Sequence, residues 1–292
     1  NDGYSISQVT SQFTKVFISD KALKFIVDEE LNNLVARNIE LIIVPRKYEI
    51  SIWGATPLSF DNNIALGSQP LGISFEGRLF KRAFDIVFSI FALLLTFPIQ
   101  ILVALAIYLE DRQNPIFIQE RVTIDNKKFK LIKFRSMRVN AESDSNAVWA
   151  ENNDPRITKV GKIIRKLWLD ELPQFINVFK GDMSVVGPRP ERLVLINEFS
   201  KNIPEFKYRT SVKAGITGYA QCLTNYDTLP ENKLKFDLIY IRKWSALFDI
   251  LIIIETVRKI VVKAFDIFSK EKVPKKAKCK TDKNYIEYIY EK

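Results

Sequence analysis

The chain has 292 residues, and its 44 lysines and arginines against 34 aspartates and glutamates give a net charge of +10. This length allows one substantial core and a smaller unit, and the positive excess favours polyanions, anionic lipid or phosphorylated substrates as partners. With no histidine, the chain lacks the usual near-neutral base, and two cysteines are too few for a disulfide framework or a cysteine-rich metal site.

Residues 13–45 have the pattern of strand, helix and strand. The apolar runs from Phe13 to Ser19 and in IELIIVP are typical of buried parallel strands, and the segment between them has amphipathic helical spacing. One βαβ unit is too small to be a domain by itself. We therefore interpret residues 1–50 as a partial Rossmann-like unit and expect the natural N-terminus to lie upstream of Asn1. Residues 51–77, rich in Gly, Pro, Ser and Asn, are predicted to be a linker.

A membrane segment is predicted over residues 78–112. Residues 86–109 form an apolar run without a charge, which as a helix reaches roughly 36 Å, enough to span a hydrocarbon core. Pro98 removes a helix hydrogen bond near the middle and is expected to bend the helix sharply. A kinked span and a re-entrant hairpin are both compatible with this pattern. The hairpin is favoured because it keeps both flanking regions, which have a cytosolic character, on one side.

Two strands with a turn at Asp125-Asn126 are predicted between residues 115 and 139. On the second strand Lys133 and Arg135 share a face, which indicates either a phosphate-binding face or a solvated edge. The following helix, RITKVGKIIRKLWLD, is predicted to bury Ile163, Ile164 and Leu167 and to carry Arg165 on a basic face.

Three more helices are predicted after residue 190. ERLVLINEFSKN forms the first, and LKFDLIYIRKW forms the second, with Asp237 and Tyr240 one turn apart. FDILIIIETVRKIVVKAF is amphipathic with a basic rim, a pattern compatible with a membrane surface or with a buried core helix. The tail over residues 266–292 is basic, and we expect it to be disordered and to bind anionic headgroups by charge.

An adjacent acid pair, Asp170 and Glu171, is the strongest candidate for chemistry. Pro173 is favoured at the start of a helix, so the chain is predicted to break near Leu172 and to place both acids at a helix–helix junction that attracts anions. Adjacent residues diverge by about 100° on a helix, so one carboxylate can attack phosphorus while the other helps to hold Mg²⁺. The alternative is a charge-complementing helix cap.

Arg189 lies between two prolines in the segment Gly187-Pro188-Arg189-Pro190. Pro190 disfavours helix for the residue before it, so Arg189 is expected to be extended, with its guanidinium oriented for bidentate binding of phosphate. The alternative is a rigid turn with an arginine facing solvent.

Six segments in order resemble a known family, and they run from about Leu79 to Ile260. They are KRAFDIVFS, KFKLIKFRSM, NDPRITKVGKIIRK, LDELPQFINVFKGDMSVVGPRP, AGITGYAQ and FDLIYIRKWS. This ordered set resembles the bacterial sugar transferases that act as polyprenyl-phosphate hexose-1-phosphate transferases, the monotopic initiating enzymes of capsule, exopolysaccharide and O-antigen synthesis. The chain is similar to the C-terminal part of a long-form member.

The resemblance implies a fold of mixed α and β, mainly α. It implies a re-entrant, proline-broken membrane helix and a catalytic domain, residues 113–265, on the cytoplasmic face of the bacterial inner membrane. It also implies Asp170 as the nucleophile on the β-phosphate of a UDP-sugar, with Glu171 beside it and Mg²⁺. It implies Arg165 and Arg189 on the phosphates or the nucleotide, and Asp237 falls on a further acidic position of the motif set. Asp237 is therefore a candidate for substrate binding, as are Lys133 and Arg135 from their shared face of the second strand. The chain departs from the family pattern at Phe97, before Pro98, and at Trp168, since serine is usual at both positions.

The predicted function is transfer of a hexose 1-phosphate from a UDP-sugar to polyprenyl phosphate, with release of UMP, through an aspartyl-phosphosugar intermediate. Its expected partners are these two substrates and anionic membrane lipid. The alternative is a non-catalytic, membrane-bound scaffold or lipid-phosphate binder. A nucleic-acid binder accounts for the positive charge but not for the apolar segment, and the chain has no helix-turn-helix or RNA-binding signature.

Overall fold

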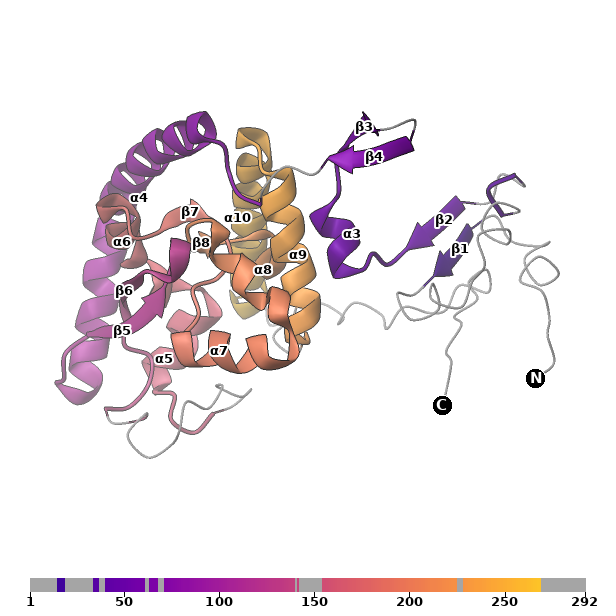
Figure 1. Cartoon of the computed structure of the whole chain (residues 1–292). Helices are drawn as coiled ribbons and strands as arrows, with labels where there is room; N and C mark the ends of the chain where they lie inside the picture. Colours follow the sequence, from indigo (N-terminus) through magenta and orange to yellow (C-terminus); the bar gives the residue numbers. More distant parts are fainter. Residues whose placement is uncertain are drawn as a thin grey trace, which may run out of the picture. The chain divides into compact units, whose positions relative to one another are not determined.

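The computed structural model of the chain describes residues 15–18, 34–36, 40–60, 63–67, 71–139, 141, 154–224 and 228–268 (Figure 1). Two units make up the chain: residues 1–54 with 271–292, and residues 55–270. The described elements mix α and β and are mainly helical, as predicted.

The first unit contains a parallel pair of strands. β1 (Lys15–Ile18) pairs with β2 (Glu40–Ile43), and α3 (Lys47–Ser51) follows. A parallel pair needs a crossover connection, and residues 34–36, within the predicted helix, are helical. The rest of the predicted helix lies outside the described residues, so the Rossmann-like assignment stays a prediction.

A hairpin occupies part of the predicted linker. β3 (Thr56–Phe60) pairs antiparallel with β4 (Asn63–Gly67), with Phe60 opposite Asn63. The glycine and asparagine that suggested a linker lie at strand ends, so this segment contains a hairpin, and its role as a linker stays a prediction. Between them Leu58 and Phe60 alternate with smaller residues at the two-residue period of a strand.

The remaining elements of the second unit surround a small core with two further strand pairs. β5 (Ile116–Val122) is antiparallel to β6 (Lys128–Phe134), and β7 (Ser184–Val186) is parallel to β8 (Gly215–Thr217). The helices are α4 (Phe75–Asp111), α5 (Lys159–Lys166), α6 (Gln174–Lys180), α7 (Leu193–Asn202), α8 (Tyr219–Leu223), α9 (Pro230–Lys243) and α10 (Ala246–Phe268), and the 3-10 segments are η3 (Ile124–Asn126), η4 (Leu169–Glu171) and η5 (Pro204–Ser211).

The predicted strand pair and its turn are confirmed. Asp125 and Asn126 both have positive φ angles, 55° and 57°, which aspartate and asparagine tolerate better than most residues. The core beside these strands joins β6, α6, β7 and α9, with Val178, Met183, Val186, Tyr240 and Ile241 at most 1% exposed. Glycine is required where β7 and β8 leave the sheet, because a Cβ on Gly215 would lie 2.0 Å from the backbone nitrogen of Gly187.

The helix α4 starts and ends at defined caps. Ser74 caps its first turn by accepting a 3.1 Å hydrogen bond from the N–H of Gly77, and Arg112 ends it in the left-handed region at φ 55°. Among the described residues α4 is the one helix long and apolar enough to cross a membrane.

The predicted break at Pro98 is wrong, since α4 continues through it as one curved helix (Figure 1). Proline removes one backbone donor, and side chains link the turns on either side. The Thr96 hydroxyl donates to the Ala92 carbonyl at 2.7 Å, and Gln100 Nε2 donates to Thr96 Oγ1 at 2.9 Å. The second of these bonds crosses the position of the proline, and the helix bends without stopping.

Most of the apolar surface of α4 is not covered by protein. The buried residues form one stripe, Lys81, Asp85, Ser89, Ala92, Val103 and Ile107. Large side chains on the other faces are 61% to 72% exposed, namely Val87, Phe91, Leu94, Leu95, Phe97 and Leu102. A contiguous apolar surface of this kind needs an apolar environment, so α4 makes the chain membrane-associated.

Both ends of α4 are bound to the same unit. Near the N-terminal end, Lys81 pairs with Asp249 of α10 at 2.6 Å, and Arg82 donates to the last carbonyls of α6 at 2.7 Å. At the C-terminal end, Asp111 forms a two-bonded pair with Arg135, at 2.5 and 2.7 Å. The helix therefore lies along the other elements of the second unit.

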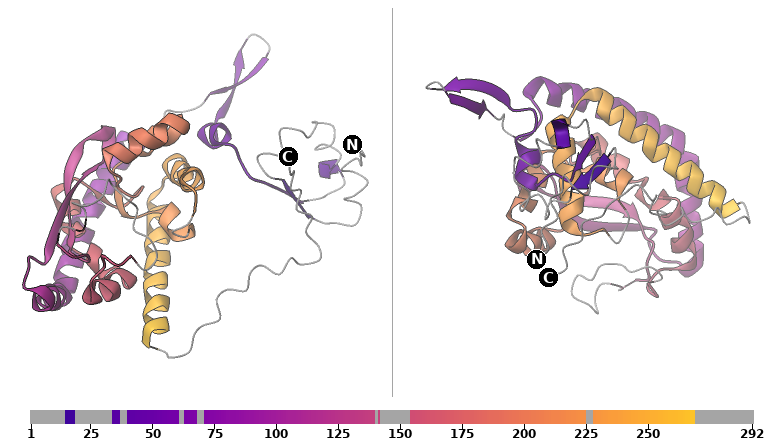
Figure 2. Two further views of the ribbon diagram at one scale, coloured as in Figure 1. Left: turned by 90° about the horizontal axis from the view of Figure 1, so that it is seen from below. Right: turned by 90° about the vertical axis from the view of Figure 1, so that its right-hand side faces the viewer.

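Two helical faces differ in how well they were predicted. In α5 only Ile164 of the predicted stripe is buried, at 3% exposure, whereas Ile163 is 59% exposed. That part of the prediction is wrong because adjacent residues of a helix diverge by about 100°, so Ile163 points away from the side that Ile164 buries. Leu167 lies after the end of α5 at Lys166. The predicted apolar face of α10 is observed: Ile250, Ile254 and Val257 are 44% to 58% exposed. Ile253 of the same face is partly buried and packs against the core, so this face lies at the edge of the core. Figure 2 shows α4 and α10 as the two long helices of the second unit.

Asp249 is the centre of a buried polar cluster between α4, α9 and α10. Its carboxylate pairs with Lys81 and accepts hydrogen bonds from the Tyr240 hydroxyl at 2.8 Å and from Trp244 Nε1 at 3.1 Å. Tyr240 also lies 3.1 Å from the carbonyl of Val186. Such a cluster stabilises a structure only while every member has its partner.

We expect Lys81→Met to destabilise the protein by about 3 kcal/mol, because it leaves a buried carboxylate without its cation. The measurement is the melting temperature in detergent. Arg78→Met removes the same charge from an exposed position of α4 and should leave the melting temperature nearly unchanged. Equal, small shifts for both variants would show that the buried pair does not join α4 to α10.

Candidate active site

The acid pair lies on a short turn between two helices, as predicted. α5 ends at Lys166, and Trp168 turns the chain with a left-handed φ of 56°. The 3-10 segment η4 carries Asp170 and Glu171, and α6 follows after Pro173. The turn is held by Leu169 and Leu172, which pack on a cluster that includes Val103 and Ile107 of α4. The position of the acid pair is therefore set by contact with the membrane helix.

The carboxyl group of Asp170 is buried, at 9% exposure. Within the part of the chain that the structure describes, it accepts no hydrogen bond. Burial and, to a smaller extent, the negative charge of Glu171 raise the pKa of Asp170 to about 7, although Lys133, Arg165 and Arg189 act in the opposite direction. A carboxyl group that is buried among cations and accepts no hydrogen bond has a perturbed pKa. Such a pKa is typical of functional sites, and a helix cap does not require it.

Glu171 is directly paired with Arg189. The guanidinium Nη2 donates to Glu171 Oε1 at 2.7 Å, with the two side chains 50% and 12% exposed. Arg189 therefore bridges the Pro-Arg-Pro loop and the acid pair, and half of its side chain remains open to solvent. The orientation predicted from Pro190 places a planar cation beside the carboxylates.

Lys133 reaches the same place from β6. Its ammonium group lies 5.1 Å from the centroid of the Phe117 ring. Burial and, to a smaller extent, the positive charge of Arg121 lower the pKa of Lys133 to about 8, although Asp170 acts in the opposite direction. The structure thus brings together Asp170, Glu171, Lys133, Arg165 and Arg189, five of the seven residues that the sequence selected.

Arg135 lies apart from this group. β6 ends at Phe134, so the alternation that placed Lys133 and Arg135 on one face does not continue. Arg135 is buried, pairs with Asp111 and donates to the carbonyl of Asn114 at 2.8 Å. The interpretation of Arg135 as a substrate contact is replaced by a structural role, in which it joins the end of α4 to β6.

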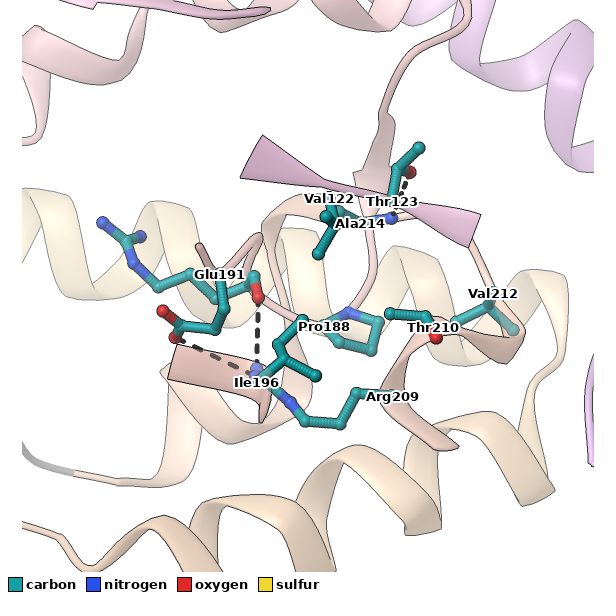
Figure 3. A pocket seen from close by; sticks show the side chains of 10 residues that line it. Val122, Thr123, Pro188, Glu191, Ile196, Arg209, Thr210, Val212 and Ala214 are labelled. Atoms are coloured by element: carbon teal, nitrogen blue, oxygen red, sulfur yellow. Dashed lines mark hydrogen bonds and ion pairs between the residues drawn. The ribbon is translucent and has the colours of Figure 1, made fainter. Parts of the chain in front are cut away.

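Asp237 acts through another residue. It is 1% exposed and bonds to Arg209 Nε at 2.6 Å. Arg209 in turn donates to the carbonyl of Arg189 at 3.1 Å and lies 3.9 Å from Glu191 (Figure 3). Asp237 is closed off from any substrate, so its predicted contact with substrate is not supported. Together with Arg209 it holds the loop that carries Arg189.

The sequence analysis did not select three residues of this arrangement, Glu191, Arg121 and Arg209. Glu191 directly follows the Pro-Arg-Pro loop and pairs with Arg121 at 3.7 Å. Arg209 belongs to η5, between two of the predicted helices. The one available signal was the unusual number of arginines near acids in segments without a clear helical face.

The two acids fit a hard divalent cation. Among the described residues no group of three or more aspartate, glutamate, cysteine or histidine side chains comes together. Mg²⁺ needs few carboxylates, since phosphate oxygens and water complete its shell. The carboxyl of Asp170, which lacks a hydrogen-bond donor, and the carboxylate of Glu171 offer such oxygens. Binding of Mg²⁺ by these two acids is part of the function that we propose below.

The raised pKa of Asp170 predicts that the acid destabilises the folded protein at neutral pH. The unfolded chain loses this proton near pH 4 and the folded protein near pH 7, so stability falls as the pH rises through that window. In metal-free buffer, Asp170→Asn should be more stable than the unsubstituted protein at pH 8 by on the order of 2–4 kcal/mol. The gain should shrink toward zero at pH 4.

Thermal unfolding in detergent at both pH values measures this difference. Asp182→Asn, on a more exposed aspartate after α6, is the control and should not show the same dependence on pH. A gain for Asp170→Asn that is equal at pH 4 and pH 8 would contradict the assignment of a raised pKa.

Comparison with known proteins identifies the group to which this arrangement belongs. A family model described as "Bacterial sugar transferase" matches residues 76–263. The chain is 46% identical over 192 residues to the UDP-glucose:undecaprenyl-phosphate glucose-1-phosphate transferase of Escherichia coli K12, over 64% of this chain and 41% of that protein. It is 42% identical over 184 residues to a UDP-N-acetylgalactosamine-undecaprenyl-phosphate N-acetylgalactosaminephosphotransferase of Aeromonas hydrophila, over 62% of this chain and 43% of the relative.

A third relative is shorter. The putative undecaprenyl-phosphate N-acetylgalactosaminyl 1-phosphate transferase of Bacillus subtilis 168 is 47% identical over 129 residues, which is 44% of this chain and 72% of that protein. The chain thus spans less than half the length of the first two relatives. The family match covers more than half of the chain, from α4 through the acid pair to α10. The chain belongs to the bacterial sugar transferase family.

Proposed function

We propose that the protein transfers a hexose 1-phosphate from a UDP-sugar to polyprenyl phosphate and releases UMP. Such a reaction initiates the assembly of capsule, exopolysaccharide or O-antigen on a lipid carrier. The names of the relatives from Escherichia coli and Aeromonas hydrophila, a UDP-sugar donor and an undecaprenyl-phosphate acceptor in both, support this choice of substrates.

One observation carries the proposal. Asp170 is buried, accepts no hydrogen bond among the described residues, and faces Lys133, Arg165 and Arg189 across a turn packed on an apolar helix. A carboxylate that is neither solvated nor hydrogen-bonded is a better nucleophile than a solvated one. The surrounding cations attract the diphosphate that it attacks.

The first step forms a covalent bond to Asp170. A carboxylate oxygen attacks the β-phosphorus of the UDP-sugar, and the bond from that phosphorus to the bridging oxygen breaks. UMP leaves with the bond electrons, and a mixed anhydride between Asp170 and the sugar phosphate remains. Lys133, Arg165 and Arg189 offset the negative charge that accumulates on the phosphate oxygens.

The second step regenerates the carboxylate. A phosphate oxygen of the polyprenyl phosphate attacks the same phosphorus, and the bond to Asp170 breaks. The product is a polyprenyl-diphospho-sugar. Arg189 can serve both steps, because it is anchored through its carbonyl by Arg209 and through its guanidinium by Glu171.

Mg²⁺ belongs to the proposal as the expected cofactor. Asp170 and Glu171 would hold it, and it would supply positive charge to the phosphate oxygens of the donor. Glu171 otherwise keeps Arg189 in place through its 2.7 Å bond. The two adjacent acids therefore have different tasks, as their divergence on the turn allows.

The proposed topology keeps the catalytic part on one side of the membrane, at the cytoplasmic face of the inner membrane. Its support is that Lys81 at one end of α4 and Asp111 at the other both pair with the same unit. A straight span would carry one of these charged pairs to the opposite side, away from its partner. We therefore propose that α4 enters the membrane and does not cross it.

Asp170→Asn should abolish transfer, by at least about a thousandfold, because the amide is not a nucleophile. The measurement is UMP release from a panel of UDP-sugars with Mg²⁺ and undecaprenyl phosphate, together with mass analysis for a sugar-phosphate adduct on residue 170 after incubation with donor alone. Asp182→Asn is the matched control and should keep near-normal turnover. Near-normal transfer by Asp170→Asn, or an active protein that never forms the adduct, would contradict the proposal.

Disruption of the Arg209–Asp237 pair should lower turnover, although Asp237 does not contact the substrate. Asp237→Asn weakens the anchor of Arg189, and we expect kcat to fall about 10- to 100-fold while the acid pair stays intact. The kinetics of UMP release check this, with the melting temperature in detergent measured in parallel. Unchanged kcat in a folded variant would show that the loop keeps its position without Asp237.

A further inference from the structure

Trp168, at the start of the acid-pair turn, has a backbone conformation that bulky residues rarely adopt. Among the described residues it is the one aromatic residue with a positive φ, 56°. Such a conformation persists only where the surrounding structure holds the residue in place. The side chain of Trp168 is therefore expected to have a partner that fixes the turn.

The backbone of Trp168 takes part in positioning the acid pair. Its carbonyl accepts a hydrogen bond from the N–H of Glu171 at 3.2 Å, and its own N–H donates to the carbonyl of Arg165 at 3.3 Å. The first of these bonds forms the 3-10 turn that carries Asp170 and Glu171. A rotation of Trp168 out of the left-handed region would therefore move both acids.

One side chain of α10 packs on the ring of Trp168. The ammonium of Lys263 lies 3.8 Å from the ring centroid, within the range of a cation–π interaction. Burial lowers the pKa of Lys263, and the positive charges of Lys259 and Lys166 act in the same direction. An ammonium that is partly removed from water is attracted more strongly to an aromatic face than an exposed one.

Lys263 belongs to the side of α10 that faces the core. Residues three or four apart lie on one side of a helix, and such a row consists of Asp249, Ile252, Thr256, Lys259 and Lys263. Thr256 lies 2.6 Å from the hydroxyl of Thr217, and Lys259 donates to the carbonyl of Cys222. The row thus begins at the buried cluster around Asp249, runs along the core and ends on Trp168.

We propose that Lys263 is a positioning residue that holds Trp168 in its left-handed conformation and so keeps Asp170 and Glu171 in place for the reaction. This inference rests on the proposed function and adds to it a residue that acts through the ring of Trp168. Leu169 and Leu172 hold the same turn from the side of α4. The acid pair is then fixed by two helices, and Lys263 supplies the contact from α10.

Hydrogen exchange of the turn tests this assignment without use of the reaction. Lys263→Met removes the ammonium and keeps a long side chain with a similar preference for helix. In detergent, the backbone N–H groups of residues 168–172 should exchange about fivefold faster, the factor that one cation–π contact contributes to an equilibrium. Exchange in the rest of the second unit and the melting temperature should stay unchanged.

Two further variants are the controls. Arg258→Met removes a cation from the exposed side of the same helix, where Arg258 pairs with Glu255 at 2.6 Å, and it should leave exchange of the turn unchanged. Lys263→Arg keeps a cation over the ring and should retain slow exchange.

The kinetics of UMP release separate positioning from substrate binding. Lys263→Met should lower kcat about fivefold and leave KM for both substrates within about twofold, because the acids move while the contacts with substrate remain. Lys263→Arg should restore kcat. Trp168→Leu removes the ring, so the addition of Lys263→Met to that variant should lower kcat no further.

Three results would overturn the proposal. The first is unchanged exchange and unchanged kcat in a folded Lys263→Met protein. The second is faster exchange throughout the second unit with a lower melting temperature, since Lys263 would then stabilise the whole unit. The third is an equal loss of kcat from Lys263→Met with and without Trp168→Leu, since Lys263 would then not act through the ring. An unsubstituted protein that releases no UMP contradicts the proposed function instead, and the exchange experiment still tests the contact.

Discussion

A carboxylate held away from water among cations is the constraint on which the rest of the structure depends. Asp170 can be buried only because Lys133, Arg165 and Arg189 lie close enough to offset part of the desolvation of its charge. Those cations come from β6, α5 and the loop after β7. The core that packs these elements together is therefore also the device that sets the charge around one side chain.

The same constraint explains why the site is joined to the membrane helix. Leu169 and Leu172, on both sides of the acid pair, pack on the cluster that contains Val103 and Ile107 of α4. Arg135 and Asp111 fix the end of the same helix to β6, the strand that carries Lys133. The apolar helix is thus both a membrane element and one wall of the core beneath the site. The water-soluble donor and the lipid acceptor of the proposed reaction can meet at such a boundary.

Buried ion pairs position the loop on the other side of the site. Arg209, held by Asp237, donates to the carbonyl of Arg189, and Glu191 lies between Arg209 and Arg121. Because Arg209 and Asp237 are nearly closed off from solvent, loss of one of these two leaves the other charge buried without compensation. The guanidinium of Arg189 remains half exposed at the end of this rigid support, where an incoming diphosphate can reach it.

Local patterns determined the elements and the acid-pair turn, because helix caps, the period of the β5–β6 pair and Pro173 act over a few residues. The acid pair and Arg189 could be selected for the same reason, since their residue types and flanking prolines carry the signal. Partners far apart in sequence were decided by tertiary packing alone. Arg135 pairs with Asp111, Asp237 with Arg209, and Lys263 with Trp168, and no local period encodes these contacts. The continuity of α4 through Pro98 also depends on its surroundings, because both of its ends are bound to the same unit.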